Sequence, residues 1–314
     1  MGMDNNIDSS INYQFKTIVM KARLFLFAAA ALILAACSNS EADEPVVNNE
    51  IRLFTKVAGS TRAANTLQGT QFANGTTISV QVTDEATSGA VTYDLATYTA
   101  DGSGGLSAST PQYYPASGSG VTIKAYHPAG AAESFSVQTD QSGNDNYNAS
   151  DLMWATPLTG VTSGSDNHTL SFSHLMSKIV VQLATGTGLL DDEINAATVK
   201  LGNADLITGG TFSTVDGTFT AAGSGSGTYT IATNAGTSAH AAIIVPQSVA
   251  GKTISVAIGG ATKSYTIPDE VVFAAGKVYT YTLTVNKTGL TVSSTITDWT
   301  APDGWSDPTP SVTF

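Results

Sequence analysis

Short runs of alternating apolar and polar residues follow one another through most of the chain, and glycine-rich turns separate them. In the second half of the chain these runs recur at intervals of about ten residues. Side chains along a strand alternate between two faces, so each run predicts a strand with one face buried. Short strands spaced in this way are typical of β-sandwiches and barrels. The sequence therefore predicts an all-β protein.

The charge balance narrows the classes of function that the chain can have. The formal net charge is −12, and only 12% of the residues are charged. Nucleic-acid binding requires basic side chains that neutralise phosphates, so no nucleic-acid partner is expected. Polar strands with few charges fit a protein of the cell surface.

The N-terminal region has the layout of an export signal. A short basic region begins at Met20 and precedes the apolar run Leu24–Ala36. As a helix this run would extend about 20 Å, which is too short for a bilayer core of ~30 Å but suits a signal peptide. We therefore expect residues 1–36 to be a signal peptide. Either Met20 is its true start, or the residues before Met20 are a long, unstructured n-region. The only cysteine, Cys37, follows the run directly.

The residues before Cys37 resemble the lipobox of bacterial lipoproteins, in which the cysteine carries the acyl chains. Cys37 is therefore the expected lipidation site, and residues 37–50 the expected tether. The alternative is a general secretion signal with an incidental cysteine.

The first predicted strand carries Ile51, Leu53 and Val57 on one face. A stretch of small residues follows it and contains Arg62, in the exposed context that proteases prefer. We expect an N-terminal domain over residues 51–165 and a C-terminal domain over residues 166–314.

The titratable residues form no constellation typical of catalysis. His168 and His174 share one face of a predicted strand but would lie ~20 Å apart, too far to share a metal ion. A structural, hydrogen-bonded His174 is the preferred interpretation. Ser165 and Asp166 lie with His168 in one short stretch, whereas triad members converge from separate elements. The sequence thus predicts no enzyme, no metal site and no cofactor.

Two weaker binding hypotheses stay open. The acidic and amide-rich tract at residues 140–151, expected as a surface loop, lacks the spacing of a calcium loop but could hold calcium weakly. Four aromatic residues could stack on sugars, although aromatic residues of β proteins usually pack in cores; they are Tyr113, Tyr114, Trp299 and Trp305.

An ordered series of local stretches resembles one known family. The series comprises the lipobox at Cys37, STRA around Arg62, YYPASGSGVTIKAYHP, DLMWA, LSFSHLMSKIVVQL, IIVPQ, FAAGKVYTYTLTV and the terminal ITDW. Together they are similar to the fimbrillin family of Bacteroidales, the subunits of type V pili. This resemblance implies two tandem transthyretin-like Greek-key β-sandwich domains.

The resemblance also implies a processing route. The subunit would reach the outer membrane as a lipoprotein, and an arginine-specific protease would cut between Arg62 and Ala63. The propeptide, residues 51–62, would take the first strand with it. A donor strand from another pilin subunit would then fill the groove, and the expected donor residues are Leu290, Val292 and Ile296. The product would be a structural pilin of the cell-surface pilus.

The family leaves two alternatives open for this chain. The protein could be the anchor or the tip of a pilus. It could also be a non-polymerising surface lipoprotein that binds glycans.

Overall fold

The structure is a computed structural model of the chain. It describes residues 49–57, 71–87, 91–164, 167–223, 229–230, 232–233 and 239–299. The predicted sites at Cys37, Arg62 and Ala63 lie outside these residues, as do Ser165, Asp166 and Trp305.

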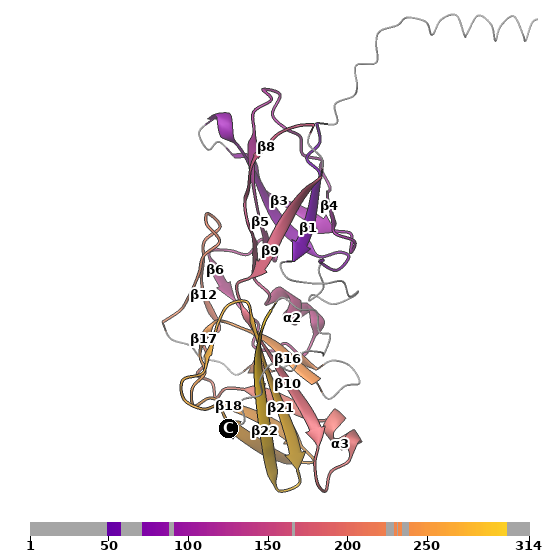
Figure 1. Cartoon of the computed structure of the whole chain (residues 1–314), viewed down its shortest axis with the longest axis vertical. Helices are drawn as coiled ribbons and strands as arrows, with labels where there is room; N and C mark the ends of the chain where they lie inside the picture. The colour runs from indigo at the N-terminus through magenta and orange to yellow at the C-terminus, as the bar shows by residue number, and fades with distance from the viewer. Residues whose placement is uncertain are drawn as a thin grey trace, which may run out of the picture. The chain divides into compact units, whose positions relative to one another are not determined.

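The described residues are predominantly strands, which confirms the all-β prediction (Figure 1). The helical elements are short: η1 (Glu85–Thr87), α2 (Asn144–Ala149) and α3 (Asp191–Asn195). No helix within the described ranges has the length and apolar character needed to cross a membrane.

The first sheet closes on itself. Its strands are β1 (Leu53–Val57), β2 (Thr77–Asp84), β3 (Val91–Ala100), β4 (Gly105–Ala108), β5 (Val121–His127), β7 (Met153–Ala155), β8 (Leu158–Val161) and β9 (His168–His174). Their order is β2-β3-β4-β1-β9-β7-β5-β8, and β2 also pairs with β5. Every strand except β8 therefore belongs to a closed ring.

The closed ring differs from the two-layer sandwich that the family resemblance implies, although the strand pattern by itself fits barrels as well as sandwiches. Strand β2 is paired along both of its edges, with β3 on one side and β5 on the other. Its register with β3 shifts between Val80 and Val82 and again before Thr83. Such bulges bend a strand and increase its twist, which allows a sheet to close. The inward side chains of β2, at Ile78, Val80 and Val82, are fully buried.

The other strands form smaller sheets. A five-stranded sheet contains, in spatial order, β15 (Ala232–Thr233), β16 (Ala239–Ile244), β10 (Ser177–Thr185), β21 (Lys277–Asn286) and β22 (Gly289–Asp298). A four-stranded sheet contains β14 (Tyr229–Thr230), β11 (Thr198–Leu201), β18 (Thr253–Ile258) and β19 (Ala261–Thr266). The remaining strands are β13 (Phe219–Ala221), β12 (Gly209–Phe212) and β6 (Ser134–Ser136) in one sheet, and β17 (Gln247–Ser248) and β20 (Val272–Phe273) in another.

The buried apolar side chains form two hydrophobic clusters. One fills the closed ring, and the other lies mainly among the sheets that follow β9. In the second cluster β10 runs parallel to β21, and its consecutive apolar residues Ile179, Val180 and Val181 are all buried. Strands covered on both faces show such continuous apolar runs.

The change from one sheet to the other comes later in the chain than the boundary expected at residues 165 and 166. Strand β9 pairs in the first sheet, whereas β10 pairs in the second. The buried positions of β9 include Leu170 and Phe172, while those of β10 include Ile179 and Val181. The side chains that pack in the two hydrophobic clusters thus fall on even-numbered residues in β9 and on odd-numbered residues in β10. The alternation shifts by one residue between the two strands, although the sequence forms one apolar run.

One of the glycine-rich stretches between the predicted strands and the tract expected as a surface loop both contain regular structure. The glycine-rich stretch after β3 contains β4. The tract at residues 140–151 contains α2, and its Gln141 and Asp151 are fully buried. The Gln141 amide exchanges two hydrogen bonds with the backbone of Ile243, which fixes this segment against the second cluster.

Candidate functional site

Strand β1 is an inner strand of the closed ring and lies between β4 and β9 (Figure 1). It runs parallel to β9, with Leu53 opposite His168 and Val57 opposite Phe172. Its antiparallel pairing with β4 covers only Leu53 and Phe54. We call the position between β4 and β9 that residues 51–57 fill the β1 slot.

The side chains of this segment alternate strictly between the core and solvent. Ile51, Leu53 and Val57 are only 3%, 1% and 4% exposed, and Thr55 is 4% exposed. The Thr55 hydroxyl donates to the Gly104 carbonyl at 3.3 Å, and the Thr55 N–H donates to the same oxygen at 2.7 Å. The predicted strand and its buried face are therefore confirmed. The slot accepts apolar side chains at three inward positions and a hydroxyl at the other.

The chain before β1 is fixed by further hydrogen bonds. The Ile51 N–H donates to the Gln112 carbonyl at 2.7 Å. Asn49 accepts from the Tyr114 N–H at 2.8 Å and donates from its side-chain amide to the Tyr114 carbonyl at 3.1 Å. These bonds extend the antiparallel side of the slot beyond β4.

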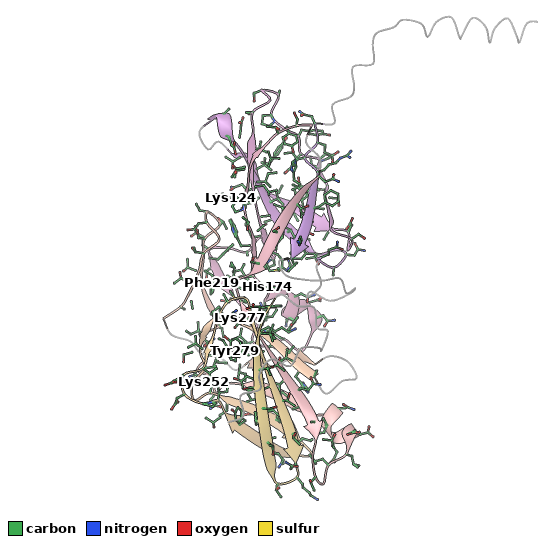
Figure 2. The ribbon with its side chains drawn as sticks, viewed as in Figure 1. Lys124, His174, Phe219, Lys252, Lys277 and Tyr279 are labelled. Atoms are coloured by element: carbon green, nitrogen blue, oxygen red, sulfur yellow. The ribbon has the colours of Figure 1, made fainter. Side chains whose placement is uncertain are left out.

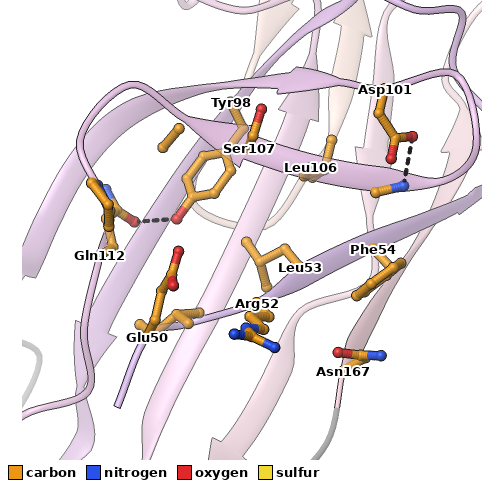
Figure 3. A pocket seen from close by; sticks show the side chains of 14 residues that line it. Glu50, Arg52, Leu53, Phe54, Tyr98, Asp101, Leu106, Ser107, Gln112 and Asn167 are labelled. Atoms are coloured by element: carbon orange, nitrogen blue, oxygen red, sulfur yellow. Dashed lines mark hydrogen bonds between the residues drawn. The ribbon is translucent and has the colours of Figure 1, made fainter. Parts of the chain in front are cut away.

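A pocket of about 430 Å³ opens beside β1 where β4 ends (Figure 3). The Tyr98 hydroxyl donates to Gln112 Oε1 at 2.8 Å, and the Gly105 N–H donates to Asp101 Oδ1 at 2.9 Å. Burial, and then the nearby Glu50 carboxylate, raises the pKa of Tyr98, so its phenol remains a proton donor. The backbone and side chains of residues 50–54 line this pocket, so it exists only while the slot is occupied.

The buried side chains of β1 make its removal costly. Burying a Val, Leu or Ile side chain contributes roughly 1.5–3 kcal/mol, so Ile51, Leu53 and Val57 together contribute on the order of 5–9 kcal/mol. A typical domain is stable by only about 5–15 kcal/mol. A subunit with an empty slot would therefore be marginal and would have two unpaired strand edges, at β4 and β9.

The predicted donor residues lie on β22, in a different sheet. This strand pairs with β21 along its whole length and is the last strand of its sheet among the described residues (Figure 1). Leu290, Val292 and Ile296 share one face of β22 and lie opposite Val285, Leu283 and Tyr279 of β21. Leu290 and Val292 are half-buried, but Ile296 is 59% exposed. Within one chain the donor residues and the slot are thus held in separate cores.

The hairpin of β21 and β22 is fixed at its open end. Lys277 forms an ion pair with Asp298, and the next residue, Trp299, donates its N–H to the Gly276 carbonyl at 2.7 Å. The Tyr279 hydroxyl donates to the Val272 carbonyl at 2.7 Å (Tyr279 is labelled in Figure 2). These contacts add to the ladder with β21 in holding β22 in place.

A buried polar cluster, which the sequence analysis did not predict as a unit, lies at the end of β9. The rings of His174 and Trp299 stack with a centroid distance of 3.7 Å and an interplanar angle of 4°. His174 Nδ1 lies 2.8 Å from Asp151 Oδ1, and all three side chains are buried (His174 is labelled in Figure 2). The structural role predicted for His174 is confirmed. No local pattern indicates the cluster, because its members come from three distant segments.

The other candidate residues have separate partners. His168 Nε2 lies 2.7 Å from the Tyr114 hydroxyl, far along β9 from the partner of His174. Tyr114 and Trp299 are buried, whereas Tyr113 is 48% exposed. Among the described residues, no three acidic, histidine or cysteine side chains are grouped so that they could hold a metal ion.

Comparison with known proteins agrees with the architecture. A protein of Bacteroides uniformis named as a fimbrium subunit, Fim1C, is 24% identical over 304 residues, which cover 90% of this chain and 97% of the relative. A crystal structure described as a cell adhesion protein, also from B. uniformis, has a TM-score of 0.64 at 22% identity. It covers 80% of this chain and 100% of its own. A second such structure, from Bacteroides ovatus, has a TM-score of 0.63 at 20% identity and covers 80% of this chain and 97% of its own.

The sequence model of the fimbrillin-like family matches residues 61–299, which is most of the chain. The ordered motifs, the all-β architecture and this match agree, and the chain belongs to the fimbrillin-like family.

Proposed function

We propose that the protein is a structural subunit of a surface fimbria, exported as a lipoprotein through Cys37. An arginine-specific protease at the outer membrane then cleaves it after Arg62, and donor-strand exchange joins it to other subunits for surface adhesion. Membership of the fimbrillin-like family supports this proposal, as does the similarity to a protein named as a fimbrium subunit. The subunit has a structural role rather than an enzymatic one.

The β1 slot is the observation that carries the proposal. Strand β1 is the first described strand, and Arg62 follows it by only a few residues. A cut after Arg62 would sever the covalent link between β1 and the remainder of the fold. Hydrogen bonds and side-chain packing alone would then retain the strand. Because β1 is at the start of the fold, its release requires no unthreading of other strands.

The vacated slot would require a replacement strand, given the stabilisation that Ile51, Leu53 and Val57 supply. Strand addition provides main-chain hydrogen bonds and pockets for alternate side chains. The donor that we propose is the C-terminal segment with Leu290, Val292 and Ile296, supplied by another subunit. We further propose that the two hydrophobic clusters correspond to tandem transthyretin-like domains, with β9 included in the first domain.

The test compares Arg62→Ala with Arg52→Ala in cells that assemble the native protein. Arg52 is an exposed residue before β1 and serves as a matched control. Mass spectrometry should find the unmodified protein and Arg52→Ala beginning at Ala63, and electron microscopy should find fibres. Arg62→Ala should retain its leader and form no fibres. Fibres made of uncleaved Arg62→Ala would contradict the proposed cleavage step.

The same measurement tests the alternatives. If every molecule on the cell retains an acylated Cys37, the lipid is permanent. The protein would then be an anchor or a surface lipoprotein that does not polymerise.

A further inference from the structure

Three buried polar atoms near the end of the closed ring have no hydrogen-bond partner among the described residues. They are Nε2 of His127, Oδ2 of Asp151 and Nε1 of Trp299. The three residues are 4%, 0% and 4% exposed, so bulk water does not reach these atoms. Buried polar atoms of folded proteins nearly always have a partner, which is either a protein group or an ordered water molecule. The three atoms therefore require an explanation.

The strand register places the three side chains together with His174. His127 of β5 and His174 of β9 both lie opposite Met153 of β7, so the two histidines project from the same face of the sheet on either side of β7. Asp151 comes just before β7 and contacts His174 at 2.8 Å, and Trp299 stacks on His174 at 3.7 Å. We call His127, Asp151, His174 and Trp299 the ring-end cluster.

The hydrogen-bonding role of each atom follows from its neighbours. His127 Nδ1 lies 2.9 Å from the Thr77 carbonyl, which can only accept, so Nδ1 carries the ring proton. Burial lowers the pKa of His127, and the neutral ring leaves Nε2 as an acceptor. The Asp151 carboxylate presents Oδ2 as a second acceptor, whereas the Trp299 indole N–H can only donate. The cluster therefore lacks a neutral group with two donors and one acceptor.

We propose that the ring-end cluster binds one ordered water molecule. The water donates to His127 Nε2 and to Asp151 Oδ2, and it accepts from the Trp299 indole N–H. Buried waters typically make about three hydrogen bonds, and this water satisfies all three atoms.

Other occupants fit the three atoms less well. A cation would face the donor hydrogen of Trp299, and an anion would face the Asp151 carboxylate. The Asn148 carbonyl near His127 does not replace the water, because it cannot donate and already accepts from the Asp151 N–H at 3.2 Å. Direct pairing across the cluster is also hindered, because two strand spacings, or about 9–10 Å, separate the backbones of β5 and β9.

The water site joins the two hydrophobic clusters. Trp299 belongs to the second cluster, whereas Phe72, whose ring lies 5.3 Å from that of His127, belongs to the cluster within the ring. The site does not depend on cleavage or strand exchange, because its residues lie outside β1, and β9 pairs with β1 only as far as Phe172. The bound water thus ties the end of the ring to the chain just after β22.

The indole proton of Trp299 reports on such a water in NMR spectra of the uncleaved chain. We expect a nuclear Overhauser cross-peak between this proton and the water resonance, and Trp299→Phe identifies the signal among the three tryptophans. Rotating-frame spectra distinguish this transfer from chemical exchange of the indole proton, because the two have opposite signs there. His127→Phe removes one acceptor and places an apolar ring beside the site, so the cross-peak should be lost.

His168→Phe is the matched control. It makes the same replacement on β9, where His168 Nε2 already lies 2.7 Å from the Tyr114 hydroxyl, so the cross-peak should remain. Absence of the cross-peak in the unmodified chain would overturn the water site. Its persistence in His127→Phe, or its equal loss in both variants, would overturn the assignment to the ring-end cluster.

A crystal structure of the unmodified, uncleaved chain keeps the proposal testable if His127→Phe does not fold. We expect one peak of electron density at roughly 2.7–3.2 Å from each of the three atoms. Density that shows these atoms bonded directly to protein groups, with no peak between them, would overturn the proposal.

Discussion

Ile296 should matter little to the isolated subunit and much to the joint between subunits. The side chain is 59% exposed on β22, so Ile296→Ala removes only a partly buried group from the monomer. In the proposed strand exchange the same side chain enters the β1 slot, where the inward position Val57 is only 4% exposed. A fully buried Ile→Ala replacement costs about 2–5 kcal/mol. Because the monomer loses part of that amount too, the joint should weaken by about 1–3 kcal/mol more than the monomer.

A differential cost of about 1–3 kcal/mol corresponds to a roughly 5- to 150-fold weaker association between subunits. Urea unfolding of the uncleaved monomer, followed by circular dichroism, measures the cost of Ile296→Ala to the monomer. Urea dissociation of assembled fibres, followed by light scattering, measures its cost to the joint between subunits. Thr297→Ala is the matched control, because Thr297 is exposed on β22 and lies on the opposite face.

Two results would refute this reasoning. If Ile296→Ala and Thr297→Ala fibres dissociate at the same urea concentration, Ile296 does not enter a buried position. If Ile296→Ala destabilises the monomer as much as the fibre, the side chain is already buried in the subunit, contrary to its exposure in the structure.

Further predictions concern the stability of the uncleaved chain. Leu53→Ala should lower its unfolding free energy by about 2–5 kcal/mol in urea. Lys56→Ala, at an exposed position of the same strand, should change it by no more than about 0.5 kcal/mol. Equal effects would contradict the burial of β1. Gly217→Ala should lower the melting temperature more than Gly251→Ala, because both glycines have positive φ but only a Cβ at Gly217 would clash with the Trp154 ring. Burial lowers the pKa of His240 to about 4, whereas the unfolded chain binds this proton near pH 6.5. The unfolding free energy should therefore fall as the pH drops from about 6.5 toward 4, by about 1–3 kcal/mol from this residue, and His240→Gln should make that fall shallower in urea titrations at each pH.

The strands themselves could be predicted from the sequence because their signal is local. The alternation at Ile51, Leu53 and Val57, and at Ile78, Val80 and Val82, indicates one buried face, and the structure buries these residues. Strand β4 was missed because Gly105 at its start provides no side chain for the pattern, and its backbone is fixed instead by the Asp101 carboxylate.

The pairing of the strands could not be predicted in the same way. The parallel pairing of β1 with β9 joins residues near 55 to residues near 170, and no local pattern encodes such a distant partner. The change of phase between Phe172 and Ile179 is visible in the sequence only once the two strands are known to be separate. The closure of the first sheet through β2 and β5 also depends on bulges that alternation does not show.

The candidate site was likewise predictable only where its residues are consecutive in the sequence. The sequence was sufficient to predict the strand before Arg62 and its buried residues, because these are consecutive. It was not sufficient to predict the stacking of Trp299 on His174, or the 2.8 Å contact of His174 with Asp151, because those residues meet only in the folded chain.

The pairing of β1 with β9 has a mechanical consequence for any strand that takes its place. The five residues Leu53–Val57 lie side by side with His168–Phe172 in one continuous register. Tension applied along such a strand loads its ladder of hydrogen bonds in shear, so the bonds must break together rather than one after another. A filament joined through this slot would therefore resist stretching with many weak bonds at once, without a covalent link between its subunits.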